Sequence, residues 1–215
     1  MCALQLPAAA LEAQAIAART YALNKLNRVR VECDCNIYST TVDQNFVGYA
    51  KETEAIYGIK WKEAVNRTFV DEENALTVTL DGKPINAFYF SSSGGVTQNI
   101  KDVWGSSIDY LLGVPDPWSL DPMINRRYAL WSRFVPQSVM AQAFGLPNVV
   151  SFAINSRTAT GSITSITATS STGASVTLTG KSSVHELNCH LPGFITPGQL
   201  SEFHLLQQSA LRISF

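Results

Sequence analysis

The sequence predicts an α+β protein in which one main N-terminal helix packs on antiparallel β-hairpins and an aromatic loop region closes a groove. Three observations carry this prediction. Small apolar residues recur at helical spacing over residues 7–24, alternating segments flank an Asp-Gly pair within residues 76–90, and a further alternating segment fills residues 151–180. The 215 residues suffice for one large domain or two small ones.

The N-terminal helix is the clearest element. Pro7 suits its first turn, where a missing N–H costs nothing. The residues that share one helical face are mostly alanine, which lets another stretch of backbone pack close to the helix; they are Leu11, Ala15, Ala18 and Ala22. A second, short helix is expected over residues 49–57.

The first hairpin is predicted from alternation and turn chemistry. Leu76 to Leu80 alternates with a period of two, and Asp81-Gly82 favours a tight turn. Residues 85–90 then form the second strand, which leads directly into residues 91–95.

The second half of the chain begins with an aromatic region. Residues 102–136 contain three tryptophans, several prolines and little periodicity, which predicts a long ordered loop packed by aromatic side chains. A short helix over residues 135–144 should follow, because Gly145 and Pro147 are typical of a helix end.

Residues 151–180 have two interpretations. Half of them are Ser or Thr, which would suit a flexible linker. Alternating isoleucines and valines favour a second hairpin instead, with strands over residues 162–167 and 176–179 around a turn at residues 171–173.

Composition excludes several function classes. The formal net charge is −1, which disfavours a nucleic-acid binder that works by phosphate neutralisation. Hydrophobic residues make up 46%, enough for a core, so disorder over most of the chain is not expected. No run of 18 apolar residues encodes a transmembrane helix, and Met1 leads into an amphipathic segment without the basic region of a signal peptide.

The four cysteines, Cys2, Cys33, Cys35 and Cys189, leave two interpretations open. Cys33 and Cys35 are too closely spaced for an ordinary CxxC redox pair. Together with His185, Cys189 or His190 they could form a zinc site. Neither cluster is a complete half-site, so unpaired thiols are the preferred interpretation, with no metal and no cofactor.

Four blocks of the sequence together resemble the SpoIID/LytB family, named for the stage II sporulation protein D and the amidase enhancer. Residues 7–22 resemble the family's helix, and residues 41–48 with Glu52 resemble its DQxYxG segment, with Phe46 in place of the tyrosine. The third block is residues 82–97, and the fourth is residues 103–105 with Tyr110 and Leu111. The resemblance covers about residues 4–180 in the family's order and spacing.

The resemblance implies cell-wall chemistry. Family members act on peptidoglycan, and the sporulation protein is a lytic transglycosylase that cuts between N-acetylmuramic acid and N-acetylglucosamine. A glutamic acid protonates the leaving oxygen and then helps the muramic C6 hydroxyl to close a 1,6-anhydro ring. In the family this residue precedes the helix, at a position that falls on Met1 or just ahead of it. No glutamate precedes Glu12, and Glu12 itself lies inside the predicted helix. The catalytic residue is therefore unknown, and this chain as written is expected to be inactive.

The substrate-binding candidates follow from the resembling blocks. Asp43 and Gln44 either line the cleft or cap a turn, and Arg19 either contacts substrate or ties the helix to a loop. Trp104 and Tyr110 either stack on sugar rings or pack internally. Residues 91–95 offer close backbone approach and hydroxyl groups for sugar. The full set is Gln14, Arg19, Tyr21, Asp43, Gln44, Ser91, Ser92, Ser93, Gly94, Gly95, Trp104 and Tyr110.

Two functions remain open, and both are preferred to a third, a Ser/Thr-rich adhesion domain. The first is a peptidoglycan lytic transglycosylase domain truncated at its N-terminus, and the second is a non-catalytic wall-binding or amidase-activating module. Both imply glycan strands as a partner and a location outside the cytoplasm, with the export signal upstream of residue 1. The second adds a cell-wall amidase as a partner.

The resemblance divides the chain into a family-like domain over residues 1–181 and an atypical tail over residues 182–215. The family usually continues after residue 181 with a segment like EFRS and then LPSxW. One choice of synonymous codons for residues 181–194, read one frame over, gives EFRSRTQLPSTWI, which is similar to that ending. We therefore hypothesise that the tail is out-of-frame translation that was never selected to pack, and that His185, Cys189 and His190 form no metal site.

Sequencing the gene across codon 181 tests the tail. We expect that restoring a single lost base there yields the EFRS reading. If no single-base change restores it, the tail is genuine sequence and the hypothesis is wrong.

Overall fold

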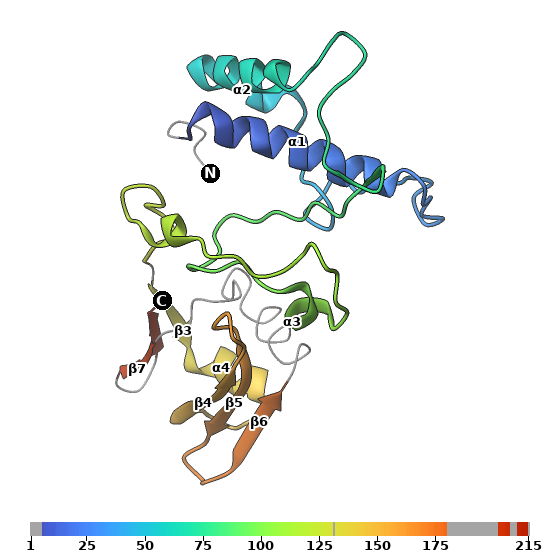
Figure 1. Cartoon of the computed structure of the whole chain (residues 1–215). Helices are drawn as coiled ribbons and strands as arrows, with labels where there is room; N and C mark the ends of the chain where they lie inside the picture. Colours follow the sequence, from blue (N-terminus) through green and yellow to red (C-terminus); the bar gives the residue numbers. More distant parts are fainter. Residues whose placement is uncertain (1–5, 131, 180–201, 207–209, 215) are drawn as a thin grey trace. The chain divides into compact units, whose positions relative to one another are not determined.

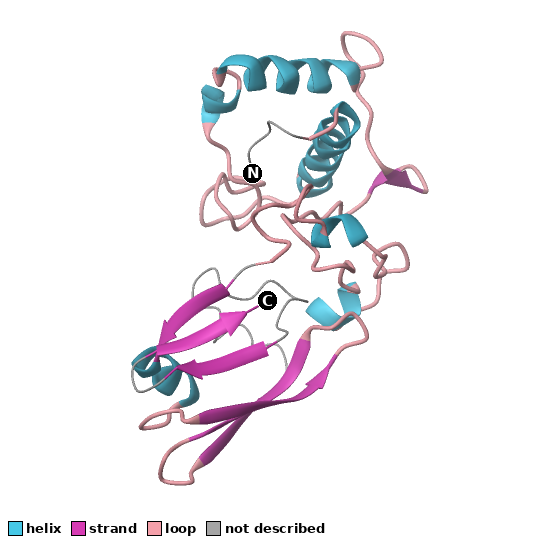
Figure 2. Cartoon of the chain, turned by 90° about the vertical axis from the view of Figure 1, so that its left-hand side faces the viewer, coloured by secondary structure: helices cyan, strands magenta, loops and turns pink. Residues whose placement is uncertain are grey.

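The fold was determined as a computed structural model, which describes residues 6–130, 132–179, 202–206 and 210–214. The chain divides into two compact units, residues 1–91 and residues 92–215, and each is described by itself. Helices and antiparallel sheets both occur, so the α+β prediction is confirmed (Figure 2).

The first unit is built on two packed helices, α1 (Ala8–Lys25) and α2 (Ala55–Arg67) (Figure 1). It also contains the 3₁₀ helix η1 (Gly48–Lys51) and the short strands β1 (Thr79–Leu80) and β2 (Lys83–Pro84). The helix predicted over residues 7–24 is confirmed. It buries Leu11 and Ala15, while Ala64 of α2 is fully buried.

The single helix predicted over residues 49–57 is wrong: the 3₁₀ helix η1 ends at Lys51, and α2 begins at Ala55. Gly48 and Ala55 both have positive φ, so the chain changes direction at the start of η1 and again at the start of α2. Inside α2, Gly58 packs on the backbone of Glu52, and a Cβ at this position would overlap the Glu52 carbonyl oxygen. The close approach of η1 and α2 therefore requires glycine.

The first predicted hairpin is present but much shorter than expected. Asp81 and Gly82 both have positive φ, as a type I′ turn requires, and Thr79 pairs with Pro84. Beyond that pair the ladder is incomplete. The N–H of Ile85 still donates to the carbonyl of Val78 at 3.2 Å, but the N–H of Val78 donates to the Thr20 hydroxyl of α1 and not to the opposite strand.

The second unit contains two three-stranded antiparallel sheets (Figure 2). One sheet has the order β4 (Ser151–Arg157), β5 (Ile163–Thr169) and β6 (Ser175–Thr179). The other has the order β3 (Ser132–Pro136), β8 (Ala210–Ser214) and β7 (Glu202–Leu206). The unit also contains the helices α3 (Ile100–Trp104) and α4 (Gln137–Phe144) and the 3₁₀ helix η2 (Pro117–Leu120).

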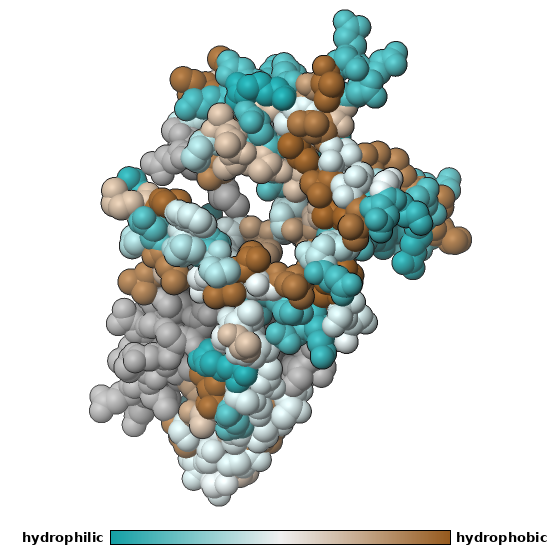
Figure 3. All heavy atoms as spheres, viewed as in Figure 1, coloured by the Kyte–Doolittle hydropathy of each residue, from teal (hydrophilic) through white to brown (hydrophobic). Residues whose placement is uncertain are grey.

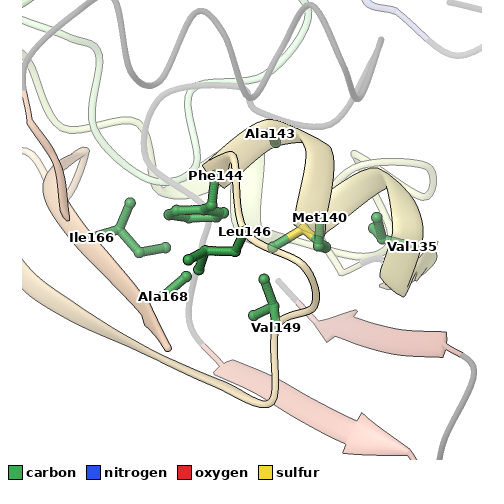
Figure 4. Packing of buried hydrophobic residues seen from close by; sticks show 8 residues of the cluster. All are labelled: Val135, Met140, Ala143, Phe144, Leu146, Val149, Ile166 and Ala168. Atoms are coloured by element: carbon green, nitrogen blue, oxygen red, sulfur yellow. The ribbon is translucent and has the colours of Figure 1, made fainter. Parts of the chain in front are cut away.

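The apolar core of the second unit lies between α4 and the sheet of β4 to β6. Met140 and Phe144 of α4 face Ile166 and Ala168 of β5, with Leu146 beside them (Figure 4). The helix ends as predicted from its sequence: Gly145 is left-handed, and the N–H of Leu146 donates to the carbonyl of Ala141.

The hairpin prediction for residues 151–180 is confirmed, and β4 adds a third strand. Alternation gives the sheet two faces, because Ile166 and Ala168 are buried while Thr167 and Thr169 lie on the other face. Hydroxyl groups bond across that face, Thr167 to Thr177 at 2.7 Å and Thr169 to Ser175 at 2.9 Å.

The predicted tail over residues 182–215 is described only in part. Strands β7 and β8 belong to it, and β8 pairs with β3. His185, Cys189 and His190 lie outside the described residues, and strand pairing does not test the reading frame. In the part of the chain that the structure describes, no helix is long and apolar enough to cross a membrane.

Candidate functional site

Asp43 is the centre of a polar cluster in the first unit. Its carboxylate accepts hydrogen bonds from the Tyr21 hydroxyl at 2.7 Å and from the Tyr38 backbone N–H at 2.9 Å. The guanidinium of Arg30 completes the cluster, 3.1 Å from the nearer oxygen. Only 2% of the Asp43 side chain is exposed, so three groups from three segments converge on a nearly dry carboxylate.

The cluster keeps Asp43 ionised. Burial alone would raise the pKa of its carboxyl group, but the hydrogen bonds from Tyr38 and Tyr21 and the charge of Arg30 lower the pKa below its usual range. Burial, with the bond to Asp43, raises the pKa of Tyr21 to about 12. Asp43 is therefore an anion and Tyr21 a neutral donor near neutral pH.

The neighbouring residue Gln44 is tied to the same helix. Its side-chain amide donates to the carbonyl of Ala18 at 2.9 Å, in the middle of α1. The predicted Asp-Gln segment is thus bonded to the helix through both of its polar side chains.

The C-terminal half of α1 also holds the segment after α2. Arg19 donates to the carbonyl of Leu76 at 2.7 Å and to the hydroxyl of Thr68 at 2.9 Å, and its guanidinium lies over the ring of Phe69. The hydroxyl of Thr20 accepts from the N–H of Val78 at 3.0 Å. Arg19 therefore ties the helix to a loop, which is one of the two roles expected for it.

Gln14 lies one turn earlier on α1 and is half-buried. No contact of the described residues ties it to the Asp43 cluster, so its role as a substrate contact stays a prediction.

The Ser and Gly candidates at residues 92–95 lie in the second unit, on the loop that precedes α3. Ser93 is buried, and its hydroxyl donates to the carboxylate of Asp116 at 2.7 Å and bonds to the hydroxyl of Ser119. The N–H of Gly95 donates to the hydroxyl of Ser119 at 2.8 Å. These bonds fix the loop against the chain around η2.

Ser92 is also held by the chain around η2, through Asn125. The side-chain amide of Asn125 donates to its hydroxyl at 2.9 Å and to the carbonyl of Ser119 at 2.8 Å. Gly95 has a φ of +104°, and a Cβ there would meet the side chain of Leu120. Ser92 and Ser93 thus shape the loop, and the lack of a side chain at Gly95 lets Leu120 pack against its backbone. Contact of Gly94 and Gly95 with sugar stays a prediction.

The remaining candidates are exposed. Ser91 ends the first unit, and Trp104 and Tyr110 flank the loop after α3 with 58% and 38% of their surface exposed. Figure 3 shows apolar residues among polar ones on the visible face of the described chain, with few of them over the strands β4 to β6. Exposed rings can stack on sugars, so this role for Trp104 and Tyr110 stays a prediction.

The structure brings the site candidates together in two groups. Tyr21, Asp43, Gln44 and Arg19 converge on α1 in the first unit, and residues 92–95 are held by the loop around η2 in the second. Sequence reasoning missed the partners that hold both groups: Arg30, Tyr38, Asp116, Ser119 and Asn125. Their signal is weak, since each is a single polar residue in an irregular segment, and only the fold shows what it contacts.

The cysteine prediction was wrong for two of the four residues. Cys33 and Cys35 form a disulfide with a Cα–Cα distance of 5.2 Å, instead of remaining free thiols. The chain reverses at these residues, with Asp34 at positive φ, and this turn brings the two side chains together. No group of three metal-ligating side chains occurs within the described residues.

Comparison with known proteins supports the resemblance. Residues 2–71 match the family model described as Stage II sporulation protein. The Amidase enhancer of Bacillus subtilis is 32% identical over 115 residues, 54% of this chain and 14% of that protein. Stage II sporulation protein D of Bacillus amyloliquefaciens is 32% identical over 117 residues, 51% of this chain and 33% of that protein.

The comparisons confirm the resemblance inferred from the sequence blocks. They do so over part of each protein, since the matched segments span a third or less of these relatives. The helix α1, Asp43 and Gln44 all fall inside the matched residues 2–71.

Replacing Asp43 tests the cluster. Because the pKa of Asp43 is lowered in the folded protein, its stabilising effect is present above the ordinary pKa of about 4 and is lost as the pH falls through the lowered value. Asp43→Asn should therefore lower the free energy of unfolding by about 1–3 kcal/mol at pH 7 and have a smaller effect in strong acid.

Urea unfolding across the pH range measures this difference. Asp71→Asn is the matched control, because Asp71 also has a lowered pKa but lies on an exposed turn. Equal losses from the two variants at pH 7 would contradict a special role for the Asp43 cluster.

Proposed function

We propose that this chain is a peptidoglycan-acting module of the SpoIID/LytB type that binds the glycan strands of the bacterial cell wall. The observation that carries the proposal is the contact between two matched sequence blocks. Tyr21 bonds to Asp43, and Gln44 bonds to Ala18, so the helix and the Asp-Gln segment are bonded directly to each other. Polar side chains beside an accessible surface suit a polymer that is rich in hydroxyl and amide groups.

The described residues favour binding over cleavage. Lytic transglycosylase chemistry, which the family resemblance suggests, needs a carboxylic acid that carries a proton near neutral pH. Asp43 cannot supply it, because its hydrogen bonds and Arg30 hold it ionised. Glu12 lies on α1, and its carboxylate is engaged in an ion pair with Arg67.

A second candidate function is activation of a cell-wall amidase. The specific observation in its favour is the match to a protein named Amidase enhancer, at the same level of identity as the match to the sporulation protein. A module that binds glycan strands could also present a partner amidase to the wall, so the two functions are compatible.

Both functions place the protein outside the cytoplasm. The disulfide between Cys33 and Cys35 supports this location, because disulfides persist in oxidising compartments and are rare in the cytosol.

Glycan binding can be tested with purified peptidoglycan from which the stem peptides have been removed. We expect the chain to sediment with this material, and we expect Trp104→Ala to weaken retention by about tenfold if the ring stacks on sugar. Trp118→Ala is the matched control, because Trp118 is similarly exposed, at 62%, in the same unit but outside the resembling blocks. No retention of the unmodified chain would overturn the proposal.

Catalysis can be tested on the same material. We expect no anhydro-muropeptides after incubation with this chain, since loss of a positioned general acid costs about 10²–10⁴ in rate. A lytic transglycosylase of established activity serves as the positive control. Anhydro products that appear with the chain and vanish with Glu12→Gln would show that the chain is an enzyme and that Glu12 is its acid.

A further inference from the structure

The turn that carries the Cys33–Cys35 disulfide begins at Arg30. The N–H of Arg30 donates to the carbonyl of Cys35 at 2.8 Å, and the N–H of Cys33 donates back to the carbonyl of Arg30 at 3.3 Å. The disulfide lies in the loop that follows α1 in the chain. Figure 1 shows the course of that loop. Arg30 is therefore both the first residue of the disulfide-closed turn and the cation that faces Asp43.

The side chain of Arg30 links this turn to the Asp43 cluster. Its guanidinium lies 4.5 Å from the ring centre of Tyr38 and bonds to both carboxylate oxygens of Asp43, at 3.1 and 3.3 Å. Tyr38 in turn donates its backbone N–H to Asp43. Any change in the turn that moves the backbone of Arg30 thus acts on the contacts of Asp43.

The disulfide is accessible and spans a very short loop. Cys33 is exposed and Cys35 half-buried, so a reductant can reach the sulfur atoms. One residue separates the two cysteines, and closing so short a loop removes little entropy from the unfolded chain. General stabilisation is therefore a weak explanation for this bond, whereas exposed disulfides are typically the labile ones.

We infer that the Cys33–Cys35 pair is a redox-responsive site that accepts electrons from a dithiol and controls how firmly Arg30 holds Asp43. The reductant's thiolate attacks Sγ of Cys33, and the bond to Cys35 breaks, leaving a thiolate that takes up a proton. The second thiol of the reductant then attacks the mixed disulfide and releases Cys33. Two electrons and two protons reach the cysteines, and the reductant becomes a disulfide.

The reduced turn loses the covalent link that keeps Cys33 and Cys35 together. The hydrogen bonds of Arg30 with Cys35 and Cys33 then depend on a turn that includes a strained Asp34 at positive φ. The inference concerns this loop and does not rest on glycan binding.

Amide hydrogen exchange of the full chain, with and without dithiothreitol, tests the inference. We expect the amides of Cys33 and Tyr38 to exchange about tenfold faster in the reduced protein, because both donate to groups that the turn positions. The amide of Leu76, which donates to the carbonyl of Thr68, is the internal control and should keep its rate. Mass analysis of the tryptic peptide covering residues 31–51 reports the redox state, since it contains both cysteines.

Two variants complete the design. C33S/C35S should show fast exchange at Tyr38 with or without the reductant, and C2S/C189S should respond as the unmodified chain does. Unchanged exchange at Cys33 and Tyr38 on complete reduction would overturn the inference. Free thiols at both positions in air-oxidised protein would overturn it as well.

Discussion

Hydrogen bonds from the C-terminal half of α1 hold together segments that have little regular structure of their own. Arg19 and Thr20 bond to the chain at residues 68–78, and Asn24 donates to the carbonyl of Pro84. Tyr21 bonds to Asp43. Each such bond contributes about 1 kcal/mol, but leaving a buried partner unsatisfied costs about 1–3 kcal/mol. In the first unit, hydrogen bonds from the polar residues of this one helix therefore hold the irregular segments in place, as strand pairing does in a sheet.

The two units are stabilised by different means. The first has few fully buried apolar side chains, and its irregular chain is organised by polar contacts to α1. The second has an apolar core between α4 and β5, in which Val149, Ile166 and Ala168 are at most 2% exposed. Buried hydroxyl groups fix its loop at residues 92–95, so polar contacts also contribute to the second unit.

Sequence patterns predicted what depends on local periodicity. The spacing of Leu11 and Ala15 predicted α1, the Asp81-Gly82 pair predicted the turn, and alternation around Ile166 predicted β5. The first hairpin was overestimated because alternation over residues 76–90 does not show that Thr20 competes for the backbone N–H of Val78. Contacts between distant single residues, such as Arg30 with Asp43 or Asn125 with Ser92, leave no periodic signal. The site candidates could be named from the resembling blocks, but their partners could not.

The hydroxyl-covered face of the sheet formed by β4, β5 and β6 has a consequence for its surroundings. Its cross-strand bonds join neutral groups, as in the pair of Thr167 and Thr177, and Asn155 donates to Thr167 on the same face. Dissolved ions screen charges and leave such bonds nearly unaffected. This face is therefore suited to a medium of variable ionic strength. The strength of the ion pairs around α2 changes with the salt concentration, whereas the hydrogen bonds across the sheet do not.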